Sequence, residues 1–164
     1  MNSTSSNECL DYNRHCNDRP DRLLDTIETS YPDLQNIVSN RPIFLGSIVD
    51  GTKTGRSIQL SGNRLIFCVP GLYLVTYSTS AVWTTLPYGT NEAIIQLILN
   101  QTLLDGSATR VQVLTPDPVE NQKSNLAKTV LVPVTTANSS LTLISTSLQI
   151  MGFIDTTITV VKVG

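Results

Sequence analysis

Two cysteines and the only histidine of the chain lie close together near its start, at Cys9, His15 and Cys16. A structural zinc site takes four ligands at characteristic spacings, and this segment offers three soft candidates, which argues against a metal centre. Cys9 and Cys16 are instead candidate cross-linking residues, through a local or inter-chain disulfide if the protein reaches an oxidising compartment. The simpler interpretation is a disordered tail in which both cysteines are free thiols.

The rest of the sequence offers little for catalysis. Because His15 is the only histidine, a Ser-His-Asp or Cys-His arrangement cannot form within residues 42–164 unless the tail folds back. The sequence also lacks a zincin helix, a phosphate-binding glycine loop and a dinucleotide fingerprint. Five carboxylates lie in or near expected loops, and their spacing singles out no pair: Asp50, Asp105, Asp117, Glu120 and Asp155. We therefore expect no enzymatic activity and assign no catalytic residue.

Three other residues have side chains suited to chemistry or to binding. Cys68 lies between Phe67 and Val69 in an apolar run, and we predict a buried, inert thiol there. Trp83 and Tyr88 lie near an expected loop. They either pack the end of a β-sandwich, which is the commoner role, or form an exposed aromatic contact site.

These residues are arranged around a strand–turn–strand segment that spans residues 64–82. Residues 65–69 are apolar and rich in β-formers, and Pro70-Gly71 is a turn pair. From Leu72 the chain alternates, with Tyr73, Val75 and Tyr77 on one face and Leu72, Leu74 and Thr76 on the other. The second face is also largely apolar, although an antiparallel strand with one side in water should alternate cleanly. A neighbouring subunit is the obvious candidate to cover it.

Composition bounds the class of protein. The chain has 164 residues, of which 40% are hydrophobic and 15% charged, and this favours one β-rich domain. A net charge of −2 with no basic stripe argues against nucleic-acid binding. No run approaches the ~20 apolar residues of a membrane-spanning helix, so we expect no membrane insertion. The first residues lack the basic start and apolar core of a signal peptide, so we expect none.

The chain divides into a polar tail, residues 1–41, and a body, residues 42–164. The tail carries seven acidic and four basic residues, hence a net charge of −3, and a short helix is expected over residues 21–28. The body shows strand after strand at about ten-residue spacing, which predicts a sandwich or barrel. The longest polar loop is expected over residues 115–124. The expected strands span residues 43–49, 57–60, 65–69, 72–82, 93–99, 102–104, 108–114, 126–134, 141–150 and 156–163.

The order of motifs resembles the C1q/TNF-like jelly-roll family. The segment from Phe67 to Tyr73 is similar to the family's Val-Pro-Gly-x-Tyr turn and the strand that follows it. Residues 94–107 and 158–164 resemble segments of the bacterial branch. Vertebrate members usually have a cysteine one residue earlier relative to the proline, and Val75 stands where an aromatic residue is usual. No collagen-like tract precedes the body.

The resemblance implies a homotrimer of jelly-roll sandwiches with about ten antiparallel strands and a flexible N-terminal tail. Phe67, Tyr73, Val75 and Tyr77 would then fill the core. The other face would meet a neighbouring subunit. The alternative is that Leu72 and Leu74 lie under a loop of their own chain. The implied trimer interface consists of Leu72, Leu74, Thr76, Val161 and Val163.

The resemblance also implies a role. The short cysteine-bearing tail and the jelly-roll head are similar to proteins of bacterial spore surfaces, including the exosporium. This suggests a structural spore-layer protein that assembles with itself and with other spore-layer proteins. The alternative is a recognition head that binds a carbohydrate or a protein receptor through its loops. Some relatives bind calcium, but no loop here has a calcium-binding spacing, so we assign no cofactor and no metal ligand.

Overall fold

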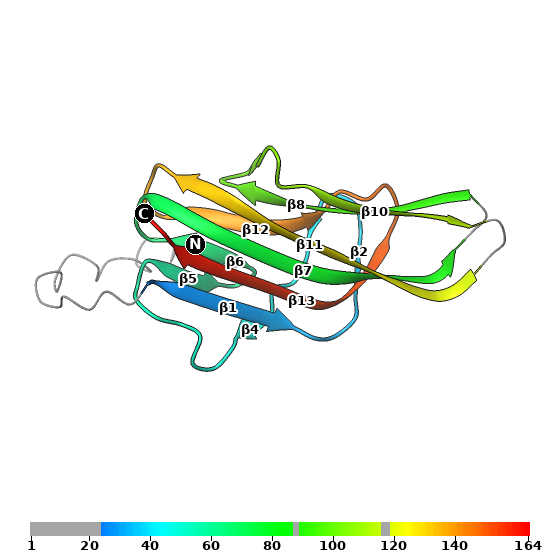
Figure 1. The fold of residues 1–164 in the computed structure, drawn as a ribbon, viewed down its shortest axis with the longest axis horizontal. Coiled ribbons are helices and arrows are strands. Elements are labelled where there is room, and N and C mark those ends of the chain that lie inside the picture. Colours follow the sequence, from blue (N-terminus) through cyan, green and yellow to red (C-terminus); the bar gives the residue numbers. More distant parts are fainter. Residues whose placement is uncertain (1–23, 87–88, 116–118) are drawn as a thin grey trace, which may run out of the picture.

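The computed structural model describes residues 24–86, 89–115 and 119–164, which form two antiparallel sheets packed face to face (Figure 1). The first sheet has the order β11-β7-β13-β1-β4, and β2 also pairs with β13. Its strands are β1 (Thr26–Tyr31), β2 (Gln35–Ile37), β4 (Ser47–Ile48), β7 (Gly71–Leu86), β11 (Val119–Val134) and β13 (Met151–Lys162).

The second sheet has the order β10-β8-β12-β6-β5, with β9 paired to β8 and β3 paired to β12. Its strands are β3 (Arg41–Pro42), β5 (Ile58–Ser61), β6 (Arg64–Phe67), β8 (Gly89–Leu99), β9 (Thr102–Leu103), β10 (Thr109–Thr115) and β12 (Ser139–Ser145). The chain changes sheet at β2–β3, β3–β4, β4–β5, β6–β7, β7–β8, β10–β11, β11–β12 and β12–β13. This is the all-β sandwich that the strand spacing predicted.

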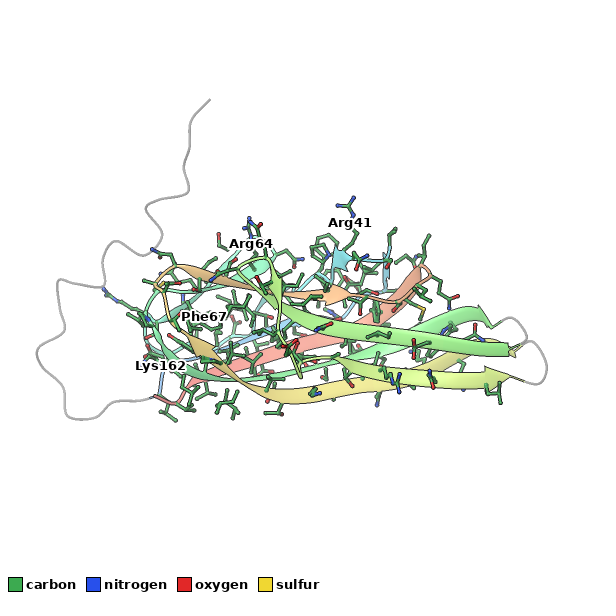
Figure 2. All side chains as sticks on the ribbon, turned by 90° about the horizontal axis from the view of Figure 1, so that it is seen from above. Arg41, Arg64, Phe67 and Lys162 are labelled. Atoms are coloured by element: carbon green, nitrogen blue, oxygen red, sulfur yellow. The ribbon has the colours of Figure 1, made fainter. Side chains whose placement is uncertain are left out.

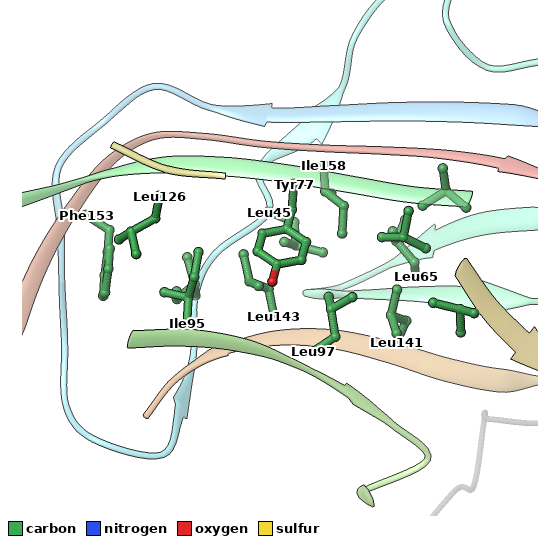
Figure 3. Packing of buried hydrophobic residues seen from close by; sticks show 14 of the residues in the cluster. Leu45, Leu65, Tyr77, Ile95, Leu97, Leu126, Leu141, Leu143, Phe153 and Ile158 are labelled. Carbon is green, nitrogen blue, oxygen red and sulfur yellow. The ribbon is translucent and has the colours of Figure 1, made fainter. Parts of the chain in front are cut away.

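Alternation along β7 builds the core. Tyr73, Val75 and Tyr77 have no exposed surface, because they point between the sheets, while Leu74 and Thr76 between them are exposed. The Phe67 and Tyr73 rings pack with their centroids 4.4 Å apart. Around them the two sheets interdigitate, as Figure 3 shows for Leu65, Ile95, Leu126, Leu143 and Phe153.

The two ends of the sandwich differ. At one end, which we call the base, β1 begins and β13 finishes, because Thr26 pairs with Val161. At the other, distal end, β7 and β11 pair on to Leu86 and Val119, whereas β13 stops pairing with β7 at Gly152 and Val82. In the second sheet β8 and β10 pair on to Gly89 and Thr115. These four strands project beyond the body as an arm (Figure 1).

The arm corrects the prediction of a long polar loop over residues 115–124. β11 begins at Val119, so most of that segment is strand. Its polar residues have low strand propensity, but their backbone pairs with β7, as Gln122 does with Trp83. β13 likewise begins at Met151 and not at residue 156, because a bulge with Asp155 at φ 56° lets the strand continue past an irregularity.

The N-terminal part of the described chain also differs from expectation. The helix predicted over residues 21–28 is wrong for Thr26–Glu28, which belong to β1. β1 pairs with β13 over six residues, and its β-branched Ile27 and Thr29 face the core. The sandwich therefore begins at Thr26, earlier than the boundary expected at residue 42. Residues 1–23 lie outside the described residues.

Candidate subunit interface

Three neighbouring strands at one edge of the first sheet, β11, β7 and β13, present an outward face without charge between the base and the middle of the molecule. Because β7, β13 and β11 are in register, their outward residues form rows: Leu131, Leu74 and Val161, then Thr129, Thr76 and Thr159. We call this the uncharged face. Its members are Leu72, Leu74, Thr76, Ser78 and Ser80 of β7, Asn125, Ala127, Thr129, Leu131 and Pro133 of β11, and Thr157, Thr159, Val161 and the adjoining Val163 of the C-terminal segment.

The basal rows of this face are apolar and exposed. Leu74 is 37% exposed, Leu131 51% and Val163 46%, while Leu72 and Val161 are half-buried. Contiguous exposed aliphatic side chains of this kind mark interaction surfaces. Leu74 is therefore not covered by any loop among the described residues.

The middle rows of the same face are polar, and most of their hydroxyls are already hydrogen-bonded. The hydroxyls of Thr76 and Thr129 lie 3.0 Å apart, and those of Ser78 and Thr157 lie 2.8 Å apart. Farther out, Ser80 donates to Asn125 Oδ1 at 2.7 Å. Because these groups have partners within the sheet, covering them would leave no unpaired hydroxyl and costs little free energy.

The structure brings four of the predicted interface residues together on this face: Leu72, Leu74, Thr76 and Val161. Val163 follows β13, where its N–H donates to Leu72 O at 2.8 Å. Sequence reasoning missed Leu131 and Thr129 of β11. A signal was present, because residues 130–134 are apolar on both faces of the strand, as residues 72–75 are.

Gly71 fixes the base of the face. Its own backbone approaches the chain end so closely that a Cβ there would lie 2.4 Å from Gly164 O and 2.9 Å from Lys162 Cε. Leu72 N donates to the same Gly164 carbonyl at 2.8 Å. The Pro70-Gly71 turn thus places the start of β7 directly beside the end of β13 and the residues that follow it.

The predicted core residues Phe67, Tyr73, Val75 and Tyr77 all lie in the buried cluster between the sheets. The Tyr73 hydroxyl donates to Val69 O at 2.7 Å, and the Tyr77 hydroxyl donates to Ser107 O. Burial raises the pKa of the Tyr77 phenol to about 12. In Figure 2, Phe67 lies within the sandwich, while Arg41 and Arg64 of the second sheet point away from it.

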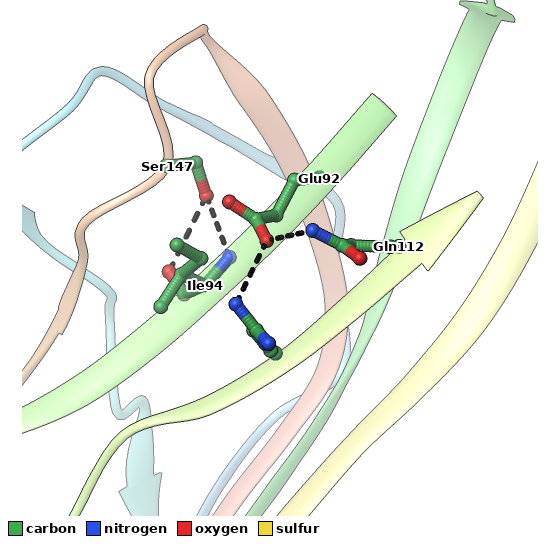
Figure 4. A network of polar contacts seen from close by, with 5 residues as sticks. Glu92, Ile94, Gln112 and Ser147 are labelled. Carbon is green, nitrogen blue, oxygen red and sulfur yellow. Dashed lines mark hydrogen bonds and ion pairs between the residues drawn. The ribbon is translucent and has the colours of Figure 1, made fainter. Parts of the chain in front are cut away.

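The outward face of the second sheet has a different character. On its arm side, Glu92 accepts a hydrogen bond from Gln112 Nε2 at 2.7 Å and lies 3.7 Å from Arg110 Nη1 (Figure 4). Nearby, Ser147 Oγ accepts the N–H of Ile94 at 2.9 Å. Water-exposed ion pairs and amides of this kind suit a surface that stays in solvent.

The remaining carboxylates and aromatic residues form no site among the described residues. Within 24–86, 89–115 and 119–164, no group of three or more His, Cys, Asp or Glu side chains is placed to hold a metal ion. Trp83 is only 3% exposed, which supports packing over an exposed contact; its Nε1 has no hydrogen-bond partner. Tyr88 and Asp117 lie outside the described residues.

The cysteines differ in part from expectation. Cys68 is 5% exposed, as predicted, but it is disulfide-bonded and not a free thiol. Sequence spacing gave no sign of this bond, because the other cysteines, Cys9 and Cys16, are distant in the chain. Both lie outside the described residues. In the described part of the chain, no helix is long and apolar enough to cross a membrane.

Comparison with known proteins places the fold. No family model and no curated protein matches the sequence. The structure is similar to Eiger TNF from S. frugiperda, with a TM-score of 0.69 and 12% identity over 87% of this chain and 94% of that one. It is also similar to the globular domain of zebrafish complement 1qA protein, with a TM-score of 0.59 and 7% identity over 85% and 98%.

Murine APRIL gives a TM-score of 0.56 and 10% identity over 86% of this chain and 100% of that one. Identities this low show the fold alone. The β-sandwich described above therefore has the C1q/TNF-like jelly-roll fold.

Proposed function

We propose that this chain is a non-enzymatic head that assembles as a homotrimer through the uncharged face. The observation that carries the proposal is the face itself, where Leu74 and Leu131 are exposed in one row and the rows on either side carry no charge on β11, β7 or β13. The C1q/TNF-like fold supports an assembly of three subunits, because the sequence resemblance associates that fold with trimers. Val161 and Val163 extend the apolar band to the chain end.

The energetics favour covering this face. A permanent interface typically buries about 2,000 Å² or more in total and is apolar in its core. The basal rows supply aliphatic surface, at about 25 cal/mol for each Å² removed from water. The middle rows add area in which most hydroxyls, such as those of Thr76 and Thr129, already have partners. No side chain of these rows on β11, β7 or β13 carries a charge that has to be desolvated.

The finer role we propose is a structural component of a bacterial spore outer layer, attached through the N-terminal segment. Its cysteines are the proposed cross-linking residues. A disulfide between Cys68 and one of the other two cysteines would leave a single cysteine, Cys9 or Cys16, for a bond to another chain. No described side chain favours the alternative recognition head, because Trp83 is buried.

The molecular mass in solution tests the trimer. The wild-type protein is expected to be a trimer with and without reductant, and Leu74→Asp is expected to be a folded monomer. The matched control is Leu103→Asp on β9, whose side chain is 48% exposed on the second sheet and which should remain trimeric. A monomeric wild type, or a monodisperse trimer from Leu74→Asp, would refute the assignment of this face.

Attachment tests the finer role. In the spore-forming host, the double variant Cys9→Ser, Cys16→Ser should be lost from the outer layer while the purified protein stays trimeric. Retention of the variant in the layer would show that the cysteines do not attach it. Loss of the trimer in the same variant would show that they serve the head and not its attachment.

A further inference from the structure

Four exposed aliphatic side chains lie in the segments beside β2 and β13, toward the distal end. We call Leu34, Val38, Leu148 and Ile150 the distal patch; they are 47%, 52%, 95% and 65% exposed. The pairing of Ile37 with Met151 brings the next residues, Val38 and Ile150, beside each other at the end of the β2–β13 ladder. Such a group needs a partner or is an aggregation hazard.

The distal patch continues the outward side of the first sheet. Leu34 Cδ1 lies 3.2 Å from the position that a Cβ on Gly152 would occupy, and the same position is 3.4 Å from Val82 Cβ. Val82 of β7 shares its side of the strand with Ser80 and Leu74. A subunit that covers the uncharged face therefore reaches the patch along the same sheet.

A complementary side chain lies on the opposite side of the molecule. Leu114 of β10 is 76% exposed, second only to Leu148 among the large hydrophobic residues of the described chain. It pairs with Thr90 in the arm, so it also lies at the distal end. β10 is the edge strand of the second sheet at the β11 side, whereas β2 lies beyond β13 on the β1 side.

Charge agrees with this placement. Asp33 adjoins Leu34, and Asp155, whose N–H donates to Pro32 O, lies close to it; Arg41, bonded through its N–H to Val38 O, is the cation on this side. The opposite edge carries three cations and two described carboxylates: Arg110, Lys123 and Lys128 with Glu92 and Asp105. The two sides are thus of opposite net sign.

We propose that Leu114 of one subunit docks into the distal patch of the next subunit around the three-fold axis. A ring of three identical chains uses a heterologous contact, in which one side of each chain meets a different side of its neighbour. The patch and the β10 edge are two such sides, at the same end of the molecule. This inference rests on the proposed trimer and names a second contact within it.

A charge-pair experiment on the full chain tests the contact. Leu148→Lys and Leu114→Glu should each raise the concentration at which the trimer half-dissociates by at least about tenfold, measured by analytical ultracentrifugation. The double variant should recover most of that loss, because each lysine would then face a glutamate of the neighbouring subunit. Leu103→Glu, on an exposed aliphatic site of the second sheet, should leave the trimer unchanged.

The outcomes separate this contact from the trimer itself. Unchanged trimers from both single variants, in a protein that Leu74→Asp dissociates, would overturn the contact and leave the proposed function standing. Additive losses in the double variant would equally overturn it, because the two residues would not meet. A wild-type monomer would instead end the proposed function, and the contact with it. Far-UV circular dichroism of each variant verifies that the sandwich is folded.

Discussion

The two sheets obey the same alternation rule but show different outer faces. Both point aliphatic and aromatic side chains inward, as Tyr77 and Ile95 do. Outward, the first sheet shows Leu74, Thr76 and Leu131, whereas the second shows Glu92, Arg110 and Gln112. The difference teaches that alternation alone identifies the core, while the residues on the opposite face indicate whether water or protein lies there.

The substitution with the largest expected effect tests directly whether the two outer faces differ. Leu131→Lys places a charge in the basal row of the uncharged face and should abolish the trimer, because an unpaired charge would have to be buried. The matched variant Leu103→Lys replaces an exposed leucine of β9 in the second sheet with the same charge and should leave the trimer intact. Size-exclusion chromatography with light scattering distinguishes the two; equal behaviour of both variants would remove the distinction between the faces.

Tyr73→Ala tests the opposite side of the same strand. The ring has no exposed surface and packs on Phe67, so its loss should lower the free energy of unfolding by about 3–5 kcal/mol. Denaturant unfolding of a monomeric Leu74→Asp background measures this without the contribution of assembly. A loss below ~1 kcal/mol would be inconsistent with a core position.

Gly71→Ala tests how the base is closed. A Cβ at this position would lie 2.4 Å from Gly164 O, so the β7–β13 junction has to shift, at a cost of about 1–3 kcal/mol. The control is Gly62→Ser in the β5–β6 turn. Its φ is positive, as at Gly71, but a Cβ there would meet no other atom. Thermal unfolding should rank Gly71→Ala below the wild type; an unchanged midpoint would show that the junction yields freely.

The raised pKa of Tyr77 predicts that the folded protein loses stability at alkaline pH. Its pKa is raised from 10.0 to about 12 by burial, so the folded protein holds this proton more tightly than the unfolded chain. The free energy of unfolding should therefore fall as pH rises from about 10 to about 12. Tyr77→Phe should be less stable at neutral pH, through the lost bond to Ser107 O, but should lose this pH dependence. An identical pH profile in both proteins would assign the transition elsewhere.

The smallest effect is expected on the second sheet. Glu92→Gln removes an exposed ion pair with Arg110 and should change the free energy of unfolding by less than about 1 kcal/mol. A large loss of stability would show that this ion pair contributes far more to folding than an exposed pair does.

Sequence reasoning recovered what local pattern determines. The alternation of Tyr73, Val75 and Tyr77 fixed the inward face of β7, and the same alternation put Leu74 opposite. Pro70-Gly71 located the crossover. Each of these features depends on residues only a few positions apart, so the signal lies within one short window.

The parts that were missed depend on contacts distant in the sequence. The shared helical face of Leu23, Leu24 and Ile27 favours a helix over residues 21–28, and only pairing with β13 makes Thr26–Glu28 part of a strand. Residues 119–125 look like a loop until β7 supplies a partner strand. The Cys68 disulfide joins positions that no spacing rule connects. Sequence therefore predicted five of the fourteen residues of the uncharged face, on β7 and in the C-terminal segment, and missed all five on β11.

The long reach of β13 has a consequence for how the molecule forms. β13 lies between β7 and β1, and it pairs Val161 with Thr26 across nearly the whole described chain. Domains with such non-local pairing fold slowly, in about milliseconds to seconds. Until β13 inserts, β7 and β1 keep unsatisfied edges that can recruit other chains. Refolding from denaturant should therefore give soluble protein in dilute solution and precipitate as the concentration rises.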